Sequence, residues 1–253
     1  MNVLVFFFLC LLFVSAPGFA QSAEAVWVEV SKTTNSIVFT QLVEDEWLAP
    51  AVIHVSDNPL SQPTMATLVD GSKVMIWSEQ QSIKSVLMIM RKDPNTNNWQ
   101  TPQLFSAFGV ENTGASMLVD LTGQLWVFWA ANSDGLDDIY FVRGEAGSWT
   151  DPKQVNAFNE VPDHLPQSVN LQTGDVQLSW LSFNFVSLSY LTEKRVFELD
   201  VPPQLLVDSE AIKEELSLTD VSLPAQMNAL QPGLVHFPDN RLVQNFLLDD
   251  HGR

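Results

Sequence analysis

The sequence predicts an all-β fold, a β-propeller of four-stranded blades with about five blades, three complete and two partial. Two observations support this. Tryptophan recurs at an interval of about fifty residues. The segments between these tryptophans contain short runs rich in β-branched and aromatic residues, such as Leu125-Trp126-Val127-Phe128-Trp129. Four such runs in each repeat unit are typical of propeller blades.

Three series of residues define the repeat. The first is a set of tryptophans, three of which follow a turn glycine (Gly71, Gly123, Gly174) by six residues: Trp27, Trp77, Trp129 and Trp180. The second is a set of tryptophans with proline three residues later: Trp47, Trp99 and Trp149. The third is a set of arginines: Arg91, Arg143 and Arg195. Since the tryptophans are strictly periodic, we expect them to pack blade against blade rather than to bind sugars.

Each unit contains four predicted strands, called a to d. Strand a precedes the glycine turn, b ends near the first tryptophan, c ends at the arginine, and d follows the proline. The predicted blade units are 21–62, 63–113, 114–165, 166–224 and the partial unit 225–253. The first unit lacks strand a and the last stops after strand b, so the sequence predicts either an open ring with exposed edges or part of a larger propeller. A short capped helix is expected at 208–216.

The N-terminus predicts export. An uncharged apolar run ends in Ala16-Pro17-Gly18-Phe19-Ala20, so 1–20 is expected to be a signal peptide and the protein to be secreted or periplasmic. No other segment is long and apolar enough to cross a membrane. Cys10, the only cysteine, lies in this run, so the remaining chain has no disulfide and no cysteine metal site. The net charge of −18 argues against nucleic acid as a partner.

One stretch resembles a known family. Residues 134–143 (DGLDDIYFVR), followed by Gly147-Ser148-Trp149-Thr150-Asp151-Pro152, are similar to the bacterial neuraminidase (BNR) repeat of sialidase-like propellers. The resemblance covers 26–250 weakly and 63–205 well. The Asp-box of that family is present only in degenerate form, at 91–99 and 143–149. In the family these boxes are structural corners of the blades, and the same role is expected here.

The resemblance does not extend to sialidase catalysis. That activity requires three arginines on the substrate carboxylate, a tyrosine nucleophile with its glutamate, and an aspartic acid. The Phe-Arg-Ile-Pro segment of the family is absent. The only tyrosines, Tyr140 and Tyr190, lie in strand c, where an outer structural position is expected. The repeat arginines are expected to pair with carboxylates on the blade surface, so no catalytic sialidase constellation is predicted.

Candidate ligand residues lie in the b–c and d–a loops, which meet at one end of a propeller. The ligand-binding candidates are Asp57, Glu111, Asp134, Asp137, Asp138 and His164. Glu79 and Asp163 are the candidate acid and base if the protein is a hydrolase. Such an acidic crown could also hold calcium or a cationic group, although no metal is assigned. The simpler interpretation is a solvated acidic rim.

Three hypotheses about function remain open. The first is an exported, non-enzymatic propeller that binds a glycan or a protein through its loops, without a cofactor. The second is a glycoside hydrolase with paired carboxylates. The third is a structural module that forms an oligomer through an open propeller edge.

Overall fold

The computed structural model describes residues 23–199, apart from 44–45, 62, 107, 133–134, 146–147 and 157–158, together with the backbone of 233–236 and 242–245. The predicted signal peptide, the predicted helix at 208–216 and Asp134 lie outside these residues. The described residues form only strands, turns and irregular segments. Among them no helix has the length and apolar character needed to cross a membrane.

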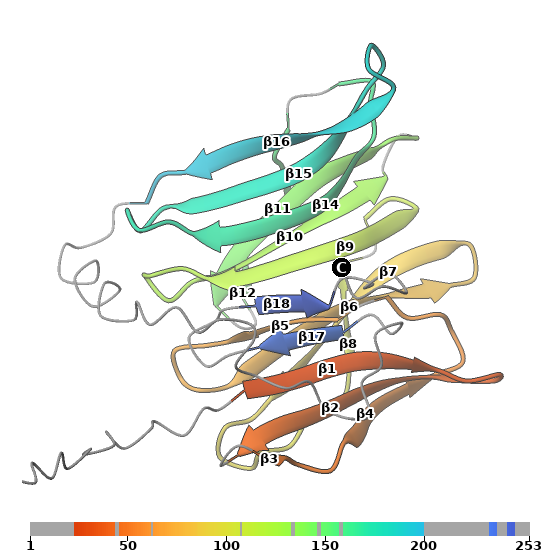
Figure 1. Cartoon of the computed structure of the whole chain (residues 1–253), viewed down its shortest axis with the longest axis vertical. Coiled ribbons are helices and arrows are strands. Elements are labelled where there is room, and N and C mark those ends of the chain that lie inside the picture. Colours follow the sequence, from red (N-terminus) through yellow and green to blue (C-terminus); the bar gives the residue numbers. More distant parts are fainter. Residues whose placement is uncertain are drawn as a thin grey trace, which may run out of the picture.

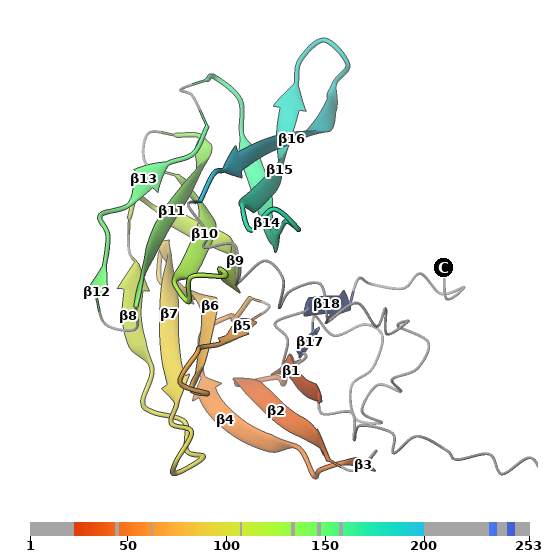
Figure 2. The ribbon, with the colours of Figure 1, turned by 90° about the vertical axis from the view of Figure 1, so that its left-hand side faces the viewer.

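Four antiparallel sheets follow one another along the chain as blades I to IV, arranged in an arc (Figure 2). Blade I contains β1 (Ala23–Val30), β2 (Asn35–Val43), β3 (Glu46–Trp47) and β4 (Ala51–Ser56). Blade II contains β5 (Thr64–Thr67), β6 (Lys73–Gln81), β7 (Lys84–Lys92) and β8 (Gln103–Ser106). Blade III contains β9 (Glu111–Val119), β10 (Leu125–Asn132), β11 (Asp137–Glu145), β12 (Ser148–Trp149) and β13 (Lys153–Gln154). Blade IV contains β14 (Asp163–Asn170), β15 (Val176–Asn184) and β16 (Ser189–Phe197).

The two partial repeat units meet in one sheet. β17 (Gly233–His236) pairs with β1, from Trp27 opposite Gly233 to Glu24 opposite His236, and so takes the position of strand a in blade I. β18 (Leu242–Asn245) then lies at the edge of the same sheet (Figure 1). β17 therefore supplies the strand a that the N-terminal unit lacks. β18 is a second copy of strand b and lies at the edge of this sheet.

The glycine turns have the geometry that the sequence predicts. Gly71, Gly123 and Gly174 have φ values of 79°, 86° and 87°, where a side chain would be strained. The end of the blades that carries these turns is called the turn face. The opposite end, with the b–c hairpins and the connections between blades, is called the loop face.

The first tryptophan series forms the packing between blades, as predicted. Trp77 belongs to a buried cluster with Val26 and Phe39 of blade I. Trp129 packs in the same way against blade II, and Trp180 against blade III. Trp27 is fully buried on the face of blade I that points away from blade II. Blades II, III and IV thus each bury their tryptophan toward the preceding blade, because the apolar face of one sheet is removed from water when it packs on the next.

The burial of strand b shows which blades are covered on both faces. In blade III nearly all of β10 is buried, and its sequence is a continuous apolar run. In blade IV the buried residues alternate, with Val176, Leu178 and Trp180 buried and Gln177 and Ser179 between them partly exposed. Almost all of β16 is exposed. In the described part of the chain, blade IV therefore packs on one face only.

The third series is not fully equivalent in space. Arg91 and Arg143 each lie three residues after the partner of the repeat tryptophan, Met88 and Tyr140. Trp180 pairs with Glu193, so the β15–β16 hairpin is longer and the equivalent residue is Val196. The prediction that Arg195 occupies the same position is wrong. Its side chain lies on the opposite face of its blade and donates a hydrogen bond to the carbonyl of Val155 in blade III.

A buried asparagine joins blades II and III on the loop face. Asn112 is 0% exposed, and its Nδ2 donates to the carbonyl oxygens of Ser85 and Phe108 at 2.9 and 2.8 Å. Its Oδ1 accepts a hydrogen bond from the indole of Trp129 at 3.1 Å. The repeat tryptophan is therefore fixed by polar contacts as well as by packing.

Replacing Asn112 with alanine should lower the free energy of unfolding by about 3 kcal/mol, because the substitution removes the buried partner of the Trp129 indole and of the Ser85 carbonyl, and a further hydrogen bond to the Phe108 carbonyl. Chemical denaturation measures this loss. Asn170→Ala is the matched control. Asn170 makes a single hydrogen bond, to the carbonyl of Val119 in the neighbouring blade, and is exposed to solvent, so its loss should be below about 1 kcal/mol. Equal losses for the two variants would contradict the role assigned to Asn112.

Candidate functional site: an acidic joint between blades III and IV

The structure brings four of the predicted site residues together on the loop face. Asp137 and Asp138 begin β11, and Asp163 and His164 begin β14. The group formed by these four residues with Asn156 and Asn159 is called the acidic joint, since it links blades III and IV. Two hairpin ends meet here because β14 packs against β11.

Two carboxylates share one amide in the acidic joint. Asn156 Nδ2 lies 2.7 Å from Asp138 Oδ1 and 2.7 Å from Asp163 Oδ2, so the two oxygens are no more than twice that distance apart. Asn159 donates a further hydrogen bond of 3.1 Å to Asp163 Oδ2. Asp138 and Asp163 are 4% and 0% exposed. The shared amide therefore holds two acidic groups close together beneath the surface.

Two acceptor atoms of the joint lack a hydrogen bond. Asp137 Oδ1 and Asp163 Oδ1 are buried and have no hydrogen-bond partner among the described residues. The other oxygen of Asp137 lies 3.0 Å from His164 Nδ1. Buried carboxylate oxygens are normally satisfied, so these two indicate that a donor from outside the described residues is expected.

A cluster of ring side chains lies beside the acidic joint. The ring of His164 lies 5.8 Å from that of Tyr190, which lies 5.3 Å from Phe183. Tyr190 is 46% exposed. Sequence analysis missed Tyr190, Phe183 and the two asparagines as site residues, because β16 was treated as one more structural strand c and amides give no signal unless the register is known.

The remaining candidates lie elsewhere. Asp57 and Glu111 are exposed, and the structure places neither within the acidic joint. Glu79 lies between blades I and II, so the structure does not bring it together with Asp163 as an acid and base pair. The cavity beside strands β5, β9 and β14, about 240 Å³, has no ionisable side chain among its lining residues. The acidic crown therefore does not converge on one central mouth but is divided among the blade junctions.

Glu79 has its own hydrogen-bond network. Its Oε1 accepts hydrogen bonds from Ser56 and Asn58 at 3.1 and 2.9 Å, and its Oε2 lies 3.5 Å from His54 Nε2. Burial alone would raise the pKa of the Glu79 carboxyl, but the hydrogen bonds from Asn58 and Ser56, with His54 beside it, bring that pKa below its ordinary value. Glu79 is therefore ionised at neutral pH and unsuited to act as a general acid.

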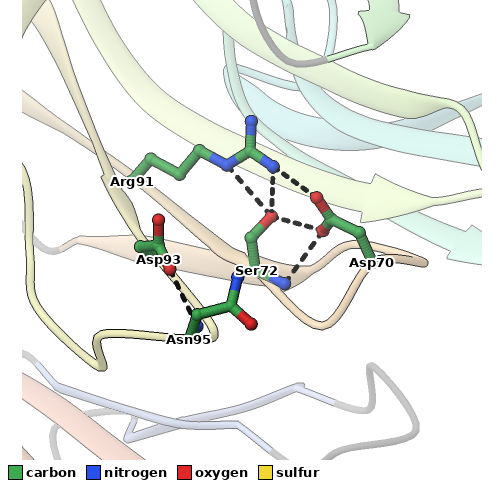
Figure 3. Close-up of polar contacts among 5 residues, drawn as sticks. All are labelled: Asp70, Ser72, Arg91, Asp93 and Asn95. Carbon is green, nitrogen blue, oxygen red and sulfur yellow. Dashed lines mark hydrogen bonds and ion pairs between the residues drawn. The ribbon is translucent and has the colours of Figure 1, made fainter.

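Arg91 and Arg143 make contacts within their own blades. Arg91 donates to Ser72 and to Asp70, whose carboxylate also accepts from Ser72 (Figure 3). Asp93, in one of the degenerate Asp-boxes, accepts a hydrogen bond from the backbone of Asn95 and so holds the turn after β7. Arg143 lies 5.4 Å over Trp126, so this arginine stacks on a ring rather than pairing with a carboxylate as predicted.

Metal binding is not indicated by the side chains that the structure describes. Among them no three His, Cys, Asp or Glu residues are grouped so that they could hold a metal ion. The chemistry available at the acidic joint is hydrogen bonding to buried carboxylates near the exposed ring of Tyr190.

Comparison with known proteins places this architecture among the β-propellers. No protein-family model matches the sequence. No curated protein matches it either. Among solved structures, the NanB sialidase of Streptococcus pneumoniae is similar with a TM-score of 0.50 and 10% identity, over 70% of this chain and 29% of that one.

Two further solved structures are similar at lower TM-scores. A Dyadobacter fermentans protein of unknown function gives 0.43 at 12% identity, over 65% of this chain and 63% of that one. An endo-arabinase of Bacteroides thetaiotaomicron gives 0.44 at 14% identity, over 68% and 74%. The chain thus spans less than two thirds of the first two proteins. The likeness to NanB concerns the fold alone, and the fold is a β-propeller of antiparallel blades.

Replacing Glu79 with glutamine should lower stability at neutral pH by about 1 kcal/mol, because the charge that His54, Ser56 and Asn58 favour is removed. A carboxyl with a lowered folded-state pKa stabilises the protein above its unfolded-state pKa, and this contribution is lost as the pH falls through the folded value. The difference between wild type and Glu79→Gln should therefore shrink on acidification. Thermal unfolding across this range measures it, with the exposed Glu111→Gln as control. A difference independent of pH would contradict the account.

Proposed function

We propose that the protein is an exported, non-enzymatic propeller that binds a glycan through the acidic joint. The observation that carries the proposal is a pair of buried carboxylate oxygens, Asp137 Oδ1 and Asp163 Oδ1, which have no partner in the described part of the chain and lie near the exposed ring of Tyr190. Sugar hydroxyls donate hydrogen bonds to carboxylates, and the apolar faces of pyranose rings pack on aromatic side chains. One neutral sugar could satisfy both requirements.

Charge also supports a neutral ligand. With a net charge of −18, and with three carboxylates in the joint, an anionic glycan would be repelled. A peptide with a basic side chain is the alternative protein ligand, because the same oxygens would accept its N–H groups. The apolar run in 1–20 supports export to the periplasm or the cell exterior, where glycans are available.

Substituting Asp137 with asparagine should weaken binding of a neutral oligosaccharide by about tenfold, since a charge-assisted hydrogen bond is lost. Tyr190→Ala should weaken it by about fivefold through the loss of ring packing. A glycan array identifies the ligand, and calorimetry measures the affinity. The exposed loop-face variants Asp57→Asn and Glu111→Gln are the controls and should bind as wild type does. Equal weakening by these controls, or the absence of any glycan ligand, would overturn the proposal.

A second candidate, glycoside hydrolysis, is favoured by one observation, the shared amide between Asp138 and Asp163. Paired carboxylates are the catalytic groups of most glycoside hydrolases. Turnover of the bound glycan by the wild type, abolished in Asp163→Asn, would establish hydrolysis in place of binding alone.

A third candidate, assembly through an open edge, is favoured by the exposure of β16. Tyr190, Leu191 and Val196 are each 44–46% exposed on this strand, which has a partner on one side only among the described residues. A mass measurement in solution distinguishes the candidates, because a strict monomer that binds glycan excludes assembly through this edge.

A further inference from the structure

A buried lysine between blades I and II has no acceptor among the residues that the structure describes. Lys92, the last residue of β7, is 4% exposed. Its Nζ lies 4.5 Å from the centre of the Phe39 ring and 5.9 Å from that of Trp99. Among the described residues it makes neither a hydrogen bond nor an ion pair. Its Nζ is not among the buried polar atoms that lack a partner, so the ammonium keeps some contact with solvent although the residue as a whole is buried. A largely desolvated ammonium without an acceptor is unfavourable, and ring faces compensate for only part of this cost.

The nearest anion is already engaged. Glu24 Oε2 lies 2.7 Å from Lys73 Nζ, and Glu24 Oε1 accepts a hydrogen bond of 2.7 Å from Gln41. Two lysines thus face one glutamate in this junction, and the local charge is positive in a protein whose net charge is −18. Burial lowers the pKa of Lys92, and Lys73 lowers it further, whereas Glu24 raises it. These directions agree with an ammonium whose own counter-charge is missing.

A second donor in the same place lacks a partner. The indole Nε1 of Trp99 is buried and unpaired among the described residues. Lys92 and Trp99 both line a groove of about 220 Å³ between the outer strands of blade I and the turn after β7. Five of its other lining residues are apolar, Phe39, Leu48, Ala49, Ala51 and Ile53, and three are polar, Thr40, Gln41 and Asn97. Two donors without partners in the described part of the chain, at a groove that is apolar over about half of its lining, form a site for a small ligand with one anionic group.

We infer that this groove binds a small monocarboxylate with a compact apolar body, whose carboxylate accepts hydrogen bonds from Lys92 and Trp99. The groove lies apart from the acidic joint and does not depend on the proposed glycan binding. A carboxylate suits the site better than phosphate or sulfate, because the apolar walls favour an apolar body and the two unpaired donors match two carboxylate oxygens.

The test uses the full chain with benzoate as probe and benzamide as its neutral counterpart. Benzoate should bind at least about tenfold more tightly than benzamide, and Lys92→Met should abolish this preference. Lys92→Met should fold, because replacing an unpaired buried charge with an apolar group of similar length leaves no partner stranded. Lys84→Met, at an exposed lysine of the same strand, is the matched control. Trp99→Phe keeps a ring, loses the N–H, and should weaken benzoate binding by a few fold.

A measurement on the wild type keeps the inference testable if a variant fails to fold. Benzoate should protect Lys92 from reductive methylation, followed by peptide mass spectrometry, and should leave Lys84 reactive. Affinity should also fall as the pH rises through the pKa of Lys92, because the neutral amine no longer attracts the anion. Equal affinity for benzoate and benzamide, tighter binding of inorganic sulfate than of benzoate, or unprotected Lys92 would each overturn the inference.

Discussion

Burial of a tryptophan from each blade against the blade before it is the interaction on which the structure depends. Trp77, Trp129 and Trp180 lie at the three blade junctions, and each is at most 7% exposed. Together with the hydrogen bonds of Asn112, this packing sets the stacking of the sheets and brings the b–c hairpins of one blade beside the first strand of the next. The acidic joint and the groove at Lys92 both lie at such junctions. Function in this protein is therefore expected between blades rather than on any single one.

The acidic joint between blades III and IV corresponds in position to the contact that Asn112 makes between blades II and III. Asn112 and Asp163 occupy equivalent positions, opposite Ala131 and Ser182, each two residues after the repeat tryptophan. In one junction the amide satisfies its neighbours, and in the other a carboxylate leaves an oxygen unpaired. A single change from amide to acid at this position thus converts a satisfied contact into an acceptor available to a ligand.

Much of the fold could be predicted from the sequence because the repeat is local. Turn glycines, tryptophans and β-rich runs each depend on nearby residues, and the positive φ at Gly123 follows from its turn alone. The position of Arg195 could not be predicted. The longer β15–β16 hairpin turns its side chain to the other face of the sheet, although the spacing of the repeat arginines along the sequence stays the same. Pairing of β17 with β1 joins distant segments, so only the structure shows how the partial units meet. For the site, loop acids could be named, but not which of them share a junction.

The most direct measurement is an experimental structure of the full chain with a neutral oligosaccharide bound. The account predicts a sugar hydroxyl within hydrogen-bond distance of Asp137 Oδ1 and a sugar ring against Tyr190, at the junction of blades III and IV. A sugar bound in the cavity beside β5, β9 and β14, or at the junction of blades I and II beside Glu79, would contradict it.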